Sequence, residues 1–524
     1  MQNSLVGNLL GLPLQGKTMP FERSEIWKNC QGFLVGIFLL YFCSVRNHAV
    51  SHASTLAAIP TELSMNNGTL KKCNSIIRNK KIEFIDLKCI DLTGYLHHIS
   101  LPVKPGILEK LLREGVGFDG SSYGFRKVEN SDMILVPDLA TAVVDPFRQA
   151  PTLSFYAHVL LTDDKRTPFS QDGRYLAKQA ERILKKTVGA DASWWGPEFE
   201  FYIFHRVKFD TRTSSSFYEV EHAEEFFKNA YHAANPFDVY DDFRDDACRI
   251  LKQFGIDAKY HHHETGERGQ QEIETYFSPL LATADNIVSS KYALFNFARQ
   301  RELFITFMPK PMYQQSGNGM HLHLFVTKNG RNAFYQKGQY GNLSKLALHF
   351  VGGILKHGAA LSAFTNPSTN SYKRLVPGFE APVALTYGRG NRSSAIRIPK
   401  YINNPAETRI EYRPPDATAN PYLCLSAMLL AGIDGVVSGI DPVAEGFGPL
   451  DQNVEDPALK ERIRFLPRNL DEALDALASD NEFLRRAGLF SDELLEQWVK
   501  IKQEEIKSIG TMPHPFEYKL YFNL

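Results

Sequence analysis

Strand-like segments carry the most informative pattern of apolar and polar positions in this chain. Within the apolar, aromatic run of residues 194–204, Glu198 and Glu200 are separated by a single residue. Successive side chains of a strand point to opposite faces, so these two carboxylates are expected to project together. Like charges on a half-buried face repel each other and resist desolvation unless a cation lies between them. The spacing therefore indicates a bound cation, most simply a metal ion.

A second segment, residues 319–325, alternates histidines with apolar residues. The alternation predicts a strand that presents His321 and His323 on one face. The preceding Ser-Gly-Asn-Gly sequence, residues 316–319, predicts a tight loop. Two imidazoles beside such a loop are candidate ligands for the same cation.

Two further segments add acidic and basic groups. Residues 408–413 predict a strand with an entirely ionic face, formed by Arg409, Glu411 and Arg413. The segment that begins with three histidines at 261–263 adds two carboxylates, Glu264 and Glu272. The candidate ligands are thus five glutamates and at least one histidine.

Oxygen-rich ligation with few nitrogens and no thiolate suits Mg²⁺ or Mn²⁺ and argues against structural zinc. Guanidinium groups bind phosphate and carboxylate in bidentate fashion. Carboxylates, metal ions and arginines together indicate phosphoryl transfer. The candidate arginines are Arg374, Arg392, Arg397, Arg409 and Arg413.

Each piece also has a purely structural interpretation. A Glu-x-Glu pair is often a solvated edge or a salt bridge, and His-x-His is often a packing feature. The arginine-rich strand is equally compatible with an ordinary ion-pair ladder, and the triple histidine with a polar turn. The occurrence of these pieces together with longer motifs favours the chemical interpretation.

Those longer motifs resemble the type I glutamine synthetases of bacteria and archaea, from about Lys80 to Leu524. Five segments carry the resemblance in the family's order, namely Phe-Asp-Gly-Ser-Ser at 118–122, Gly-Pro-Glu-Phe-Glu at 196–200, the run from Asn370 to Pro382, the run from Asn391 to Pro399, and Ala-Asn-Pro-Tyr-Leu at 419–423. The resemblance implies a two-step reaction, in which ATP phosphorylates the glutamate side chain and ammonia then displaces phosphate.

The resemblance also implies roles for individual residues. Glu200, Glu264 and Glu272 would hold a metal ion near glutamate, and Glu198, His321 and Glu411 a metal ion that bridges the ATP phosphates. Arg374, Arg413, Gly317 and Glu200 would bind glutamate, and His262, His323, Arg397 and Arg409 the nucleotide. Asp119 would attract ammonium and help to deprotonate it, Arg392 would stabilise the transferring phosphoryl group, and Glu380 would shield the acyl phosphate from water.

Some positions depart from the family's pattern. The family often has a glutamate at Lys259, a serine at Phe325, a lysine near Ala406 and an asparagine at Ser316. These departures affect the expected contacts to adenosine and to the glutamate backbone, and leave the expected metal ligands unchanged.

The resemblance implies an α+β fold, with a small β-grasp domain over residues 65–163. A large catalytic domain over residues 164–524 would carry a curved antiparallel sheet surrounded by helices. Apolar runs predict strands at 82–87 and 95–101 and helices at 107–113, 173–186 and 420–440. Relatives form dodecamers of two hexameric rings with active sites between subunits, so Asp119 would act in a neighbouring subunit.

Residues 1–64 are the odd part of the chain. The apolar run 32–45 is shorter than a bilayer span and resembles the core of a signal peptide. Export would separate the enzyme from ATP, so we interpret these residues as an extension upstream of a start at Met65. Membrane attachment through them is the alternative.

Composition fits a cytoplasmic enzyme. The 524 residues include 59 basic and 59 acidic ones, so no nucleic-acid surface is expected. The six cysteines lack CxxC spacing, which suggests reduced thiols.

The expected activity is glutamine synthesis. The alternatives are a ligase that joins glutamate to another amine, such as a polyamine or ethanolamine, and a catalytically silent relative that keeps the ring assembly. Retention of Asp119 favours ammonium, and retention of all six metal ligands argues against a silent relative.

Overall fold

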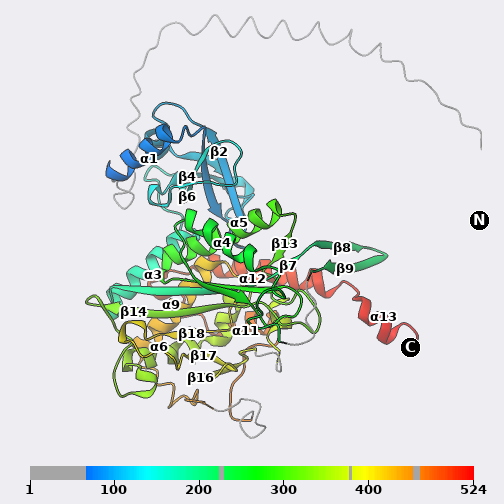
Figure 1. The fold of residues 1–524 in the computed structure, drawn as a ribbon. Coiled ribbons are helices and arrows are strands. Elements are labelled where there is room, and N and C mark those ends of the chain that lie inside the picture. Colours follow the sequence, from blue (N-terminus) through cyan, green and yellow to red (C-terminus); the bar gives the residue numbers. More distant parts are fainter. Residues whose placement is uncertain (1–66, 224–228, 377–380, 452–460) are drawn as a thin grey trace, which may run out of the picture. The chain divides into compact units, whose positions relative to one another are not determined.

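Two large β-sheets, a two-stranded hairpin and surrounding helices make up the described part of the protein, as expected for an α+β fold (Figure 1). The computed structural model describes residues 67–223, 229–376, 381–451 and 461–524. The predicted N-terminal extension and its apolar run 32–45 lie outside these residues, as does Glu380.

The first sheet has the strand order β2-β1-β6-β4-β3, with β5 paired to β6. β1 and β6 are parallel and the other pairs are antiparallel. The elements are α1 (Asn67–Asn79), β1 (Phe84–Ile90), β2 (Leu96–Pro102), α2 (Ile107–Glu114), β3 (Val116–Asp119), β4 (Asp132–Pro137), β5 (Val143–Val144) and β6 (Thr152–Leu161). The strands and helix predicted between residues 82 and 113 are present with ends shifted by a few residues.

Helix α1 was not predicted, although its sequence carries the signal. Leu70, Cys73 and Ile77 recur at helical spacing and pack against the core of the first sheet. That core includes the fully buried Leu87 and Leu135. The helix is thus a cover over the apolar face of this sheet.

The second sheet has the order β10-β11-β7-β14-β18-β17-β16. Its pairs along this order are antiparallel except β16–β17. The short strands β12 and β13 pair with β7, and β15 pairs with β14. The bounds are β7 (Ala192–Phe204), β10 (Ala258–His263), β11 (Gln270–Thr275), β12 (Ser278–Pro279), β13 (Phe304–Thr306), β14 (Met320–Lys328), β15 (Arg331–Asn332), β16 (Ala384–Arg389), β17 (Ser394–Ile398) and β18 (Ile410–Tyr412).

Helices accompany this sheet, and α9 (Pro421–Ser438) contacts α3, α5, α6 and α7. The Asn420 side chain accepts a hydrogen bond from the Tyr422 N–H at its start, and Gly439 ends it in the left-handed conformation. Of the described helices, α9 alone is by itself long and apolar enough to cross a membrane, and 78% of it is buried inside the protein. The other helices are α3 (Gly173–Val188), α4 (Asp241–Gln253), α5 (Leu280–Gln300), α6 (Lys345–Lys356), α7 (Gly358–Thr365), α8 (Ser371–Arg374), α11 (Leu470–Ser479), α12 (Asp492–Gly510) and α13 (Pro515–Tyr521).

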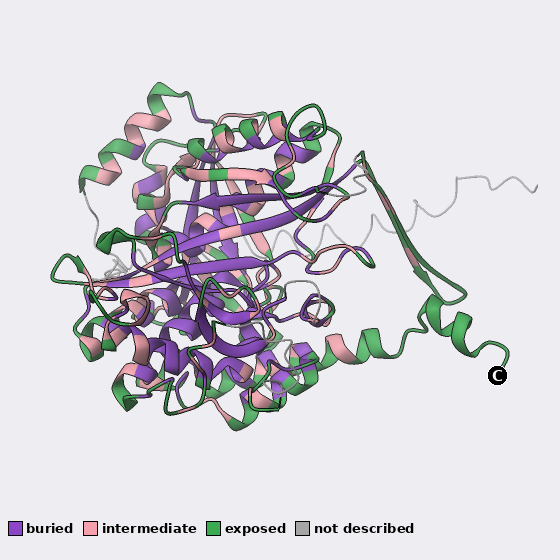
Figure 2. Cartoon of the chain, turned by 60° about the horizontal axis from the view of Figure 1, so that its bottom comes forward, coloured by how far each residue is buried: buried purple, intermediate pink, exposed green. Residues whose placement is uncertain are grey.

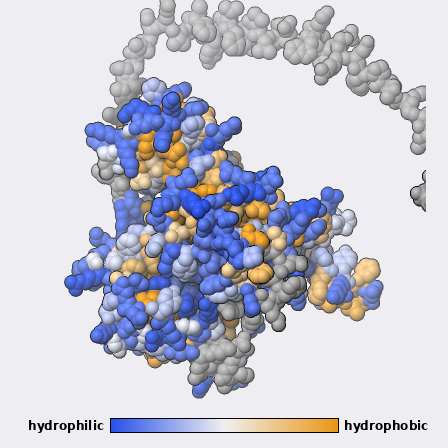
Figure 3. Space-filling view, viewed as in Figure 1, coloured by the Kyte–Doolittle hydropathy of each residue, from blue (hydrophilic) through white to orange (hydrophobic). Residues whose placement is uncertain are grey.

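Burial separates the second sheet from two exposed elements (Figure 2). The long strands of the sheet are buried along most of their length, whereas the hairpin of β8 (Arg206–Arg212) and β9 (Ser215–Glu221) and helix α13 are exposed. The face seen in Figure 3 is mainly hydrophilic, and helix α13 adds an apolar spot to it.

Candidate active site

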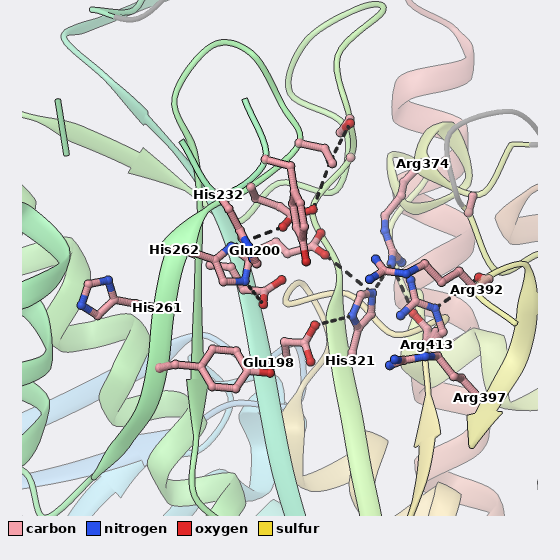
Figure 4. A pocket seen from close by; sticks show the side chains of 18 of the residues that line it. Glu198, Glu200, His232, His261, His262, His321, Arg374, Arg392, Arg397 and Arg413 are labelled. Atoms are coloured by element: carbon pink, nitrogen blue, oxygen red, sulfur yellow. Dashed lines mark hydrogen bonds and ion pairs between the residues drawn. The ribbon is translucent and has the colours of Figure 1, made fainter. Parts of the chain in front are cut away.

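A cavity of about 530 Å³ opens beside the second sheet and gathers most of the predicted site residues (Figure 4). Glu198 and Glu200 of β7 and His262 of β10 lie on one side of it, and four labelled arginines lie on the other. His321 lies between the two sides. An acidic half thus faces a basic half across one hollow.

Strand register explains why the acidic groups meet. Glu200 is paired with Glu272 across β7 and β11, and Glu198 is paired with His321 across β7 and β14. Directly opposed residues of neighbouring strands place their side chains on the same face. The prediction that Glu198 and Glu200 project together is confirmed, since both line the cavity.

The first ligand group consists of Glu198, His321 and Glu411, whose ligand atoms all lie within 4.8 Å of one another. His321 Nδ1 lies 3.1 Å from Glu198 Oε1 and 3.9 Å from Glu411 Oε1. Glu411 also accepts hydrogen bonds from Arg397 and Arg413. The three residues that were expected to share one ion are therefore adjacent.

The second ligand group consists of His262, Glu264 and Glu272. His262 Nε2 lies 2.9 Å from Glu272 Oε1, and His262 Nδ1 lies 3.6 Å from Glu264 Oε2. Glu200 accepts a 2.6 Å hydrogen bond from the Gly319 N–H and approaches His321 Nε2 at 3.7 Å. His262, assigned from the sequence to the nucleotide, thus belongs geometrically with the carboxylates.

The pKa shifts of the second ligand group indicate whether its carboxylates suit a divalent ion. Burial and the nearby charge of Glu200 raise the pKa of Glu264 to about 8. Burial, followed by the charge of Glu198, raises the pKa of Glu272 well above its usual value. A divalent cation among these carboxylates would remove the penalty that both shifts express. The hard oxygen and imidazole donors fit Mg²⁺ or Mn²⁺.

Arg374 closes the basic side of the cavity. Its Nη1 donates to the Pro414 carbonyl at 2.7 Å, and its Nη2 donates to the Arg413 carbonyl at 3.2 Å. These bonds fix the guanidinium beside the loop that contains Gly317 and Gly319. A Cβ atom at Gly317 would lie 2.6 Å from Arg374 Cγ, and one at Gly319 would lie 2.4 Å from Arg374 Nη2.

Residues 316–319, predicted as a tight loop, form a loop without regular secondary structure that leads directly into β14. Gly317 and Gly319 of this loop lie against Arg374, where a Cβ atom would clash with the arginine side chain. The two glycines therefore allow Arg374 to approach the backbone closely.

The remaining predicted basic residues divide into two sets. Arg392, Arg397 and Arg413 line the cavity. Arg409 and His323 lie beside it instead, where Arg409 Nε donates to His323 Nδ1 at 3.3 Å. The Arg409 guanidinium also lies over the rings of Phe277 and Tyr401.

Asp119 lies at the exposed end of β3 and does not line the cavity beside the second sheet. It accepts hydrogen bonds from the hydroxyls of Ser121 and Ser122 and from the Ser121 N–H. These bonds, from Ser121 first, lower the pKa of Asp119 far below its usual value. Its carboxylate is therefore a permanent negative charge that is free to face another molecule.

The sequence interpretation missed several lining residues. Tyr231 and His232 stack at 3.9 Å between ring centroids, and His232 meets His262 edge-on at 4.3 Å. They lie in an irregular segment whose sequence has no periodicity to reveal it. Glu274, which is not among the lining residues, was not predicted either, although it follows Glu272 by two residues on the same face of β11.

Comparisons with known proteins identify both regions. The family model described as "Glutamine synthetase, beta-Grasp domain" matches residues 81–162, and "Glutamine synthetase, catalytic domain" matches residues 170–521. The chain is 41% identical over 471 residues to the glutamine synthetase of Frankia alni, with 86% of this chain and 98% of the relative covered. It is 39% identical over 473 residues to that of Pseudomonas aeruginosa, with 86% and 99% covered.

Solved structures agree with these matches. The cryo-EM structure of Plasmodium falciparum glutamine synthetase superimposes with a TM-score of 0.78 and 28% identity, covering 87% of this chain and 99% of that one. A structure of GmaS without ligand gives a TM-score of 0.73 and 27% identity, covering 86% and 99%. The α+β fold expected from the sequence, a β-grasp domain followed by a catalytic domain with a curved sheet, is confirmed. The chain belongs to the glutamine synthetase family.

Proposed function

We propose that this chain joins ammonia to L-glutamate at the expense of ATP. A γ-carboxylate oxygen of glutamate attacks the γ-phosphorus of ATP, and ADP leaves. Ammonia then attacks the acyl carbon of γ-glutamyl phosphate, loses a proton, and phosphate leaves. The observation that supports this function best is the cavity itself, where two acidic ligand groups face Arg374, Arg392, Arg397 and Arg413.

Two ions of Mg²⁺ or Mn²⁺ fit the ligand groups. Glu198, His321 and Glu411 would hold one of them, and Glu200, Glu264 and Glu272, with His262 beside them, the other. Such ions, when bound, neutralise the charge of the ATP phosphates and polarise the transferring group. The protein's own contribution is to keep these carboxylates close together before any substrate arrives.

The arginines would orient the anionic reactants. We assign Arg374 and Arg413, together with Gly317, to glutamate, since guanidinium forks match carboxylates. Arg392 would stabilise the phosphoryl group in transit, and Arg397, Arg409 and His323 the nucleotide phosphates. Glu380 would exclude water from the acyl phosphate, an assignment that rests on the sequence motif alone.

The ammonium site would be completed by a second copy of the chain. Asp119 carries a permanent charge at an exposed strand end, away from the cavity of its own chain. This placement supports a shared site in a type I dodecamer of two hexameric rings. We further propose domain boundaries at residues 65–163 and 164–524 and a cytoplasmic location, where ATP is available.

The test is a comparison of nucleophiles with purified protein, glutamate and ATP. Phosphate release that depends on ammonium, with glutamine as product, is expected. Greater turnover with ethanolamine or a polyamine would favour the amine ligase, and no phosphate release with any amine would favour a silent relative. The bacterial relatives named glutamine synthetase support the first outcome.

A further inference from the structure

A third group of ion-ligating side chains lies beside the two already assigned. The ligand atoms of Glu198, Glu274 and His323 all lie within 4.8 Å of one another. Glu274 and His323 are buried, and Glu198 is shared with the first group. By residue type alone, this group is as suitable for a divalent ion as the other two.

Lys259 already occupies the acidic end of this third group. Its Nζ lies 2.8 Å from Oε1 of Glu274, whose side chain has no exposed surface. Within the described residues, no other Lys, Arg or His pairs with Glu274 at salt-bridge distance, and its second oxygen has no hydrogen-bond partner. The neutralisation of this buried carboxylate therefore depends on Lys259.

A local irregularity of β10 brings the lysine to this position. The register of β10 against β11 shifts between Ala258 and Tyr260, so Lys259 lies in a bulge while Tyr260 faces Glu274. A bulge re-aims the side chain that it contains. The Lys259 ammonium also lies 5.0 Å from the centroid of the Tyr260 ring.

Two neighbours hold the His323 ring beside Glu274 in this arrangement. Arg409 Nε donates to His323 Nδ1, because a guanidinium has no acceptor atom. The other ring nitrogen, Nε2, lies 3.2 Å from Glu198 Oε2, within hydrogen-bonding distance. Both ring nitrogens are thus engaged, one by Arg409 and one by Glu198.

We propose that Lys259 serves as the resident cation of the third group, so that the chain holds two divalent ions per site and not three. One carboxylate of this group, that of Glu274, is already paired with the Lys259 ammonium. A divalent ion added there would be repelled by this ammonium, and Lys259→Met removes the repulsion. The second group differs, since within the described residues neither Glu264 nor Glu272 pairs with a lysine or arginine.

This inference rests on the proposed function but is tested without turnover. Mn²⁺ binding to the full chain is measured by equilibrium dialysis in the absence of substrates. Two ions per chain are expected for the wild type and for Lys259→Arg. Three are expected for Lys259→Met, and two again for Lys259→Met combined with Glu274→Gln. Lys252→Met removes the exposed Lys252–Asp257 pair and serves as the matched control, with two ions expected.

Three ions in the wild type would overturn the inference, as would two in Lys259→Met with thermal stability and assembly size unchanged. If Lys259→Met fails to fold, Glu274→Gln in the wild-type background decides. If Lys259 is the resident cation, Glu274→Gln binds two ions, as the wild type does. If Glu274 normally binds a metal ion, the number of bound ions falls from three in the wild type to two in Glu274→Gln. Failure of the proposed function is distinguishable, because it leaves these ion counts intact and abolishes glutamine formation by the wild type.

Discussion

Glu198 and His321 are directly opposed across β7 and β14, and Glu198 Oε1 lies 3.1 Å from His321 Nδ1. The contact links two segments more than a hundred residues apart, and it is fixed by backbone pairing on both sides. Burial opposes the ionised form of Glu198, but its hydrogen bonds with His321 and His323 outweigh burial and lower its pKa well below the usual value. The first ligand group is therefore held in place and charged by the sheet itself.

Replacing Glu200 by alanine is expected to abolish formation of γ-glutamyl phosphate. Glu200 lies between the two ligand groups, and its carboxylate is anchored by the Gly319 N–H. Loss of a metal ligand forfeits several kcal/mol of transition-state stabilisation, so kcat should fall by about 10³-fold or more. Phosphate release is the measurement, and the exposed Glu219→Ala is the matched control. Undiminished ATP-dependent product in Glu200→Ala would refute the ligand assignment.

Asp119→Asn should chiefly raise the concentration of ammonium that the enzyme requires. The substitution keeps the shape of the side chain and removes a charge that attracts a cation, so KM for ammonium is expected to rise by about 10- to 100-fold. KM values for ATP and glutamate should change little. An unchanged ammonium requirement would count against the role of Asp119.

Mixed assemblies test where Asp119 acts. Subunits with Asp119→Asn and subunits with Glu200→Ala, when assembled together, should form some sites with neither defect if each site draws on two chains. A normal ammonium requirement should then reappear in part of the activity. If no mixed assembly shows a normal ammonium requirement, Asp119 acts in the active site of its own chain.

Gly317→Ala should weaken glutamate binding. The added methyl group would lie 2.6 Å from both Arg374 Cγ and the Pro309 carbonyl oxygen, so the guanidinium or the loop has to move. Overpacking of this kind costs about 1–3 kcal/mol, which corresponds to a rise in KM for glutamate of roughly 5- to 150-fold. Gly510→Ala, where no atom lies within 4 Å of the new methyl group, is the control. Unchanged glutamate kinetics would contradict the placement of Arg374.

His357 should make stability depend on pH. Burial alone would lower its pKa, but hydrogen bonds with Asp434 and Asp480, at 3.2 and 2.9 Å, outweigh burial and raise it. The stabilisation is therefore fully present below the unfolded pKa of about 6.5 and is lost as the pH rises through the higher folded pKa. Thermal unfolding should show the largest deficit of His357→Gln relative to wild type at pH 6, shrinking towards pH 9. A deficit independent of pH would show that His357 contributes only packing.

The local sequence pattern predicted which neighbouring side chains of a strand share a face. The pairing of strands that are distant in the sequence determines which of these side chains lie together in the site. The i, i+2 spacing placed Glu198 with Glu200 and His321 with His323 correctly, because the period of a strand is a local property. The pairing of β7 with β11 and β14 on either side is not encoded in any local pattern. The salt bridge between Lys259 and Glu274 therefore could not be predicted, nor could the contact of His262 with Glu272.

Isotope transfer shows whether this chain activates the γ-carboxyl of glutamate with ATP before ammonia attacks. L-Glutamate labelled with ¹⁸O in its γ-carboxyl group is incubated with the full chain, ATP, Mg²⁺ and ammonium, and the released phosphate is analysed by mass spectrometry. One ¹⁸O atom is expected in the phosphate for each glutamine formed, because the labelled oxygen leaves with the phosphoryl group. Unlabelled phosphate accompanying glutamine formation would show that the γ-carboxyl is not phosphorylated.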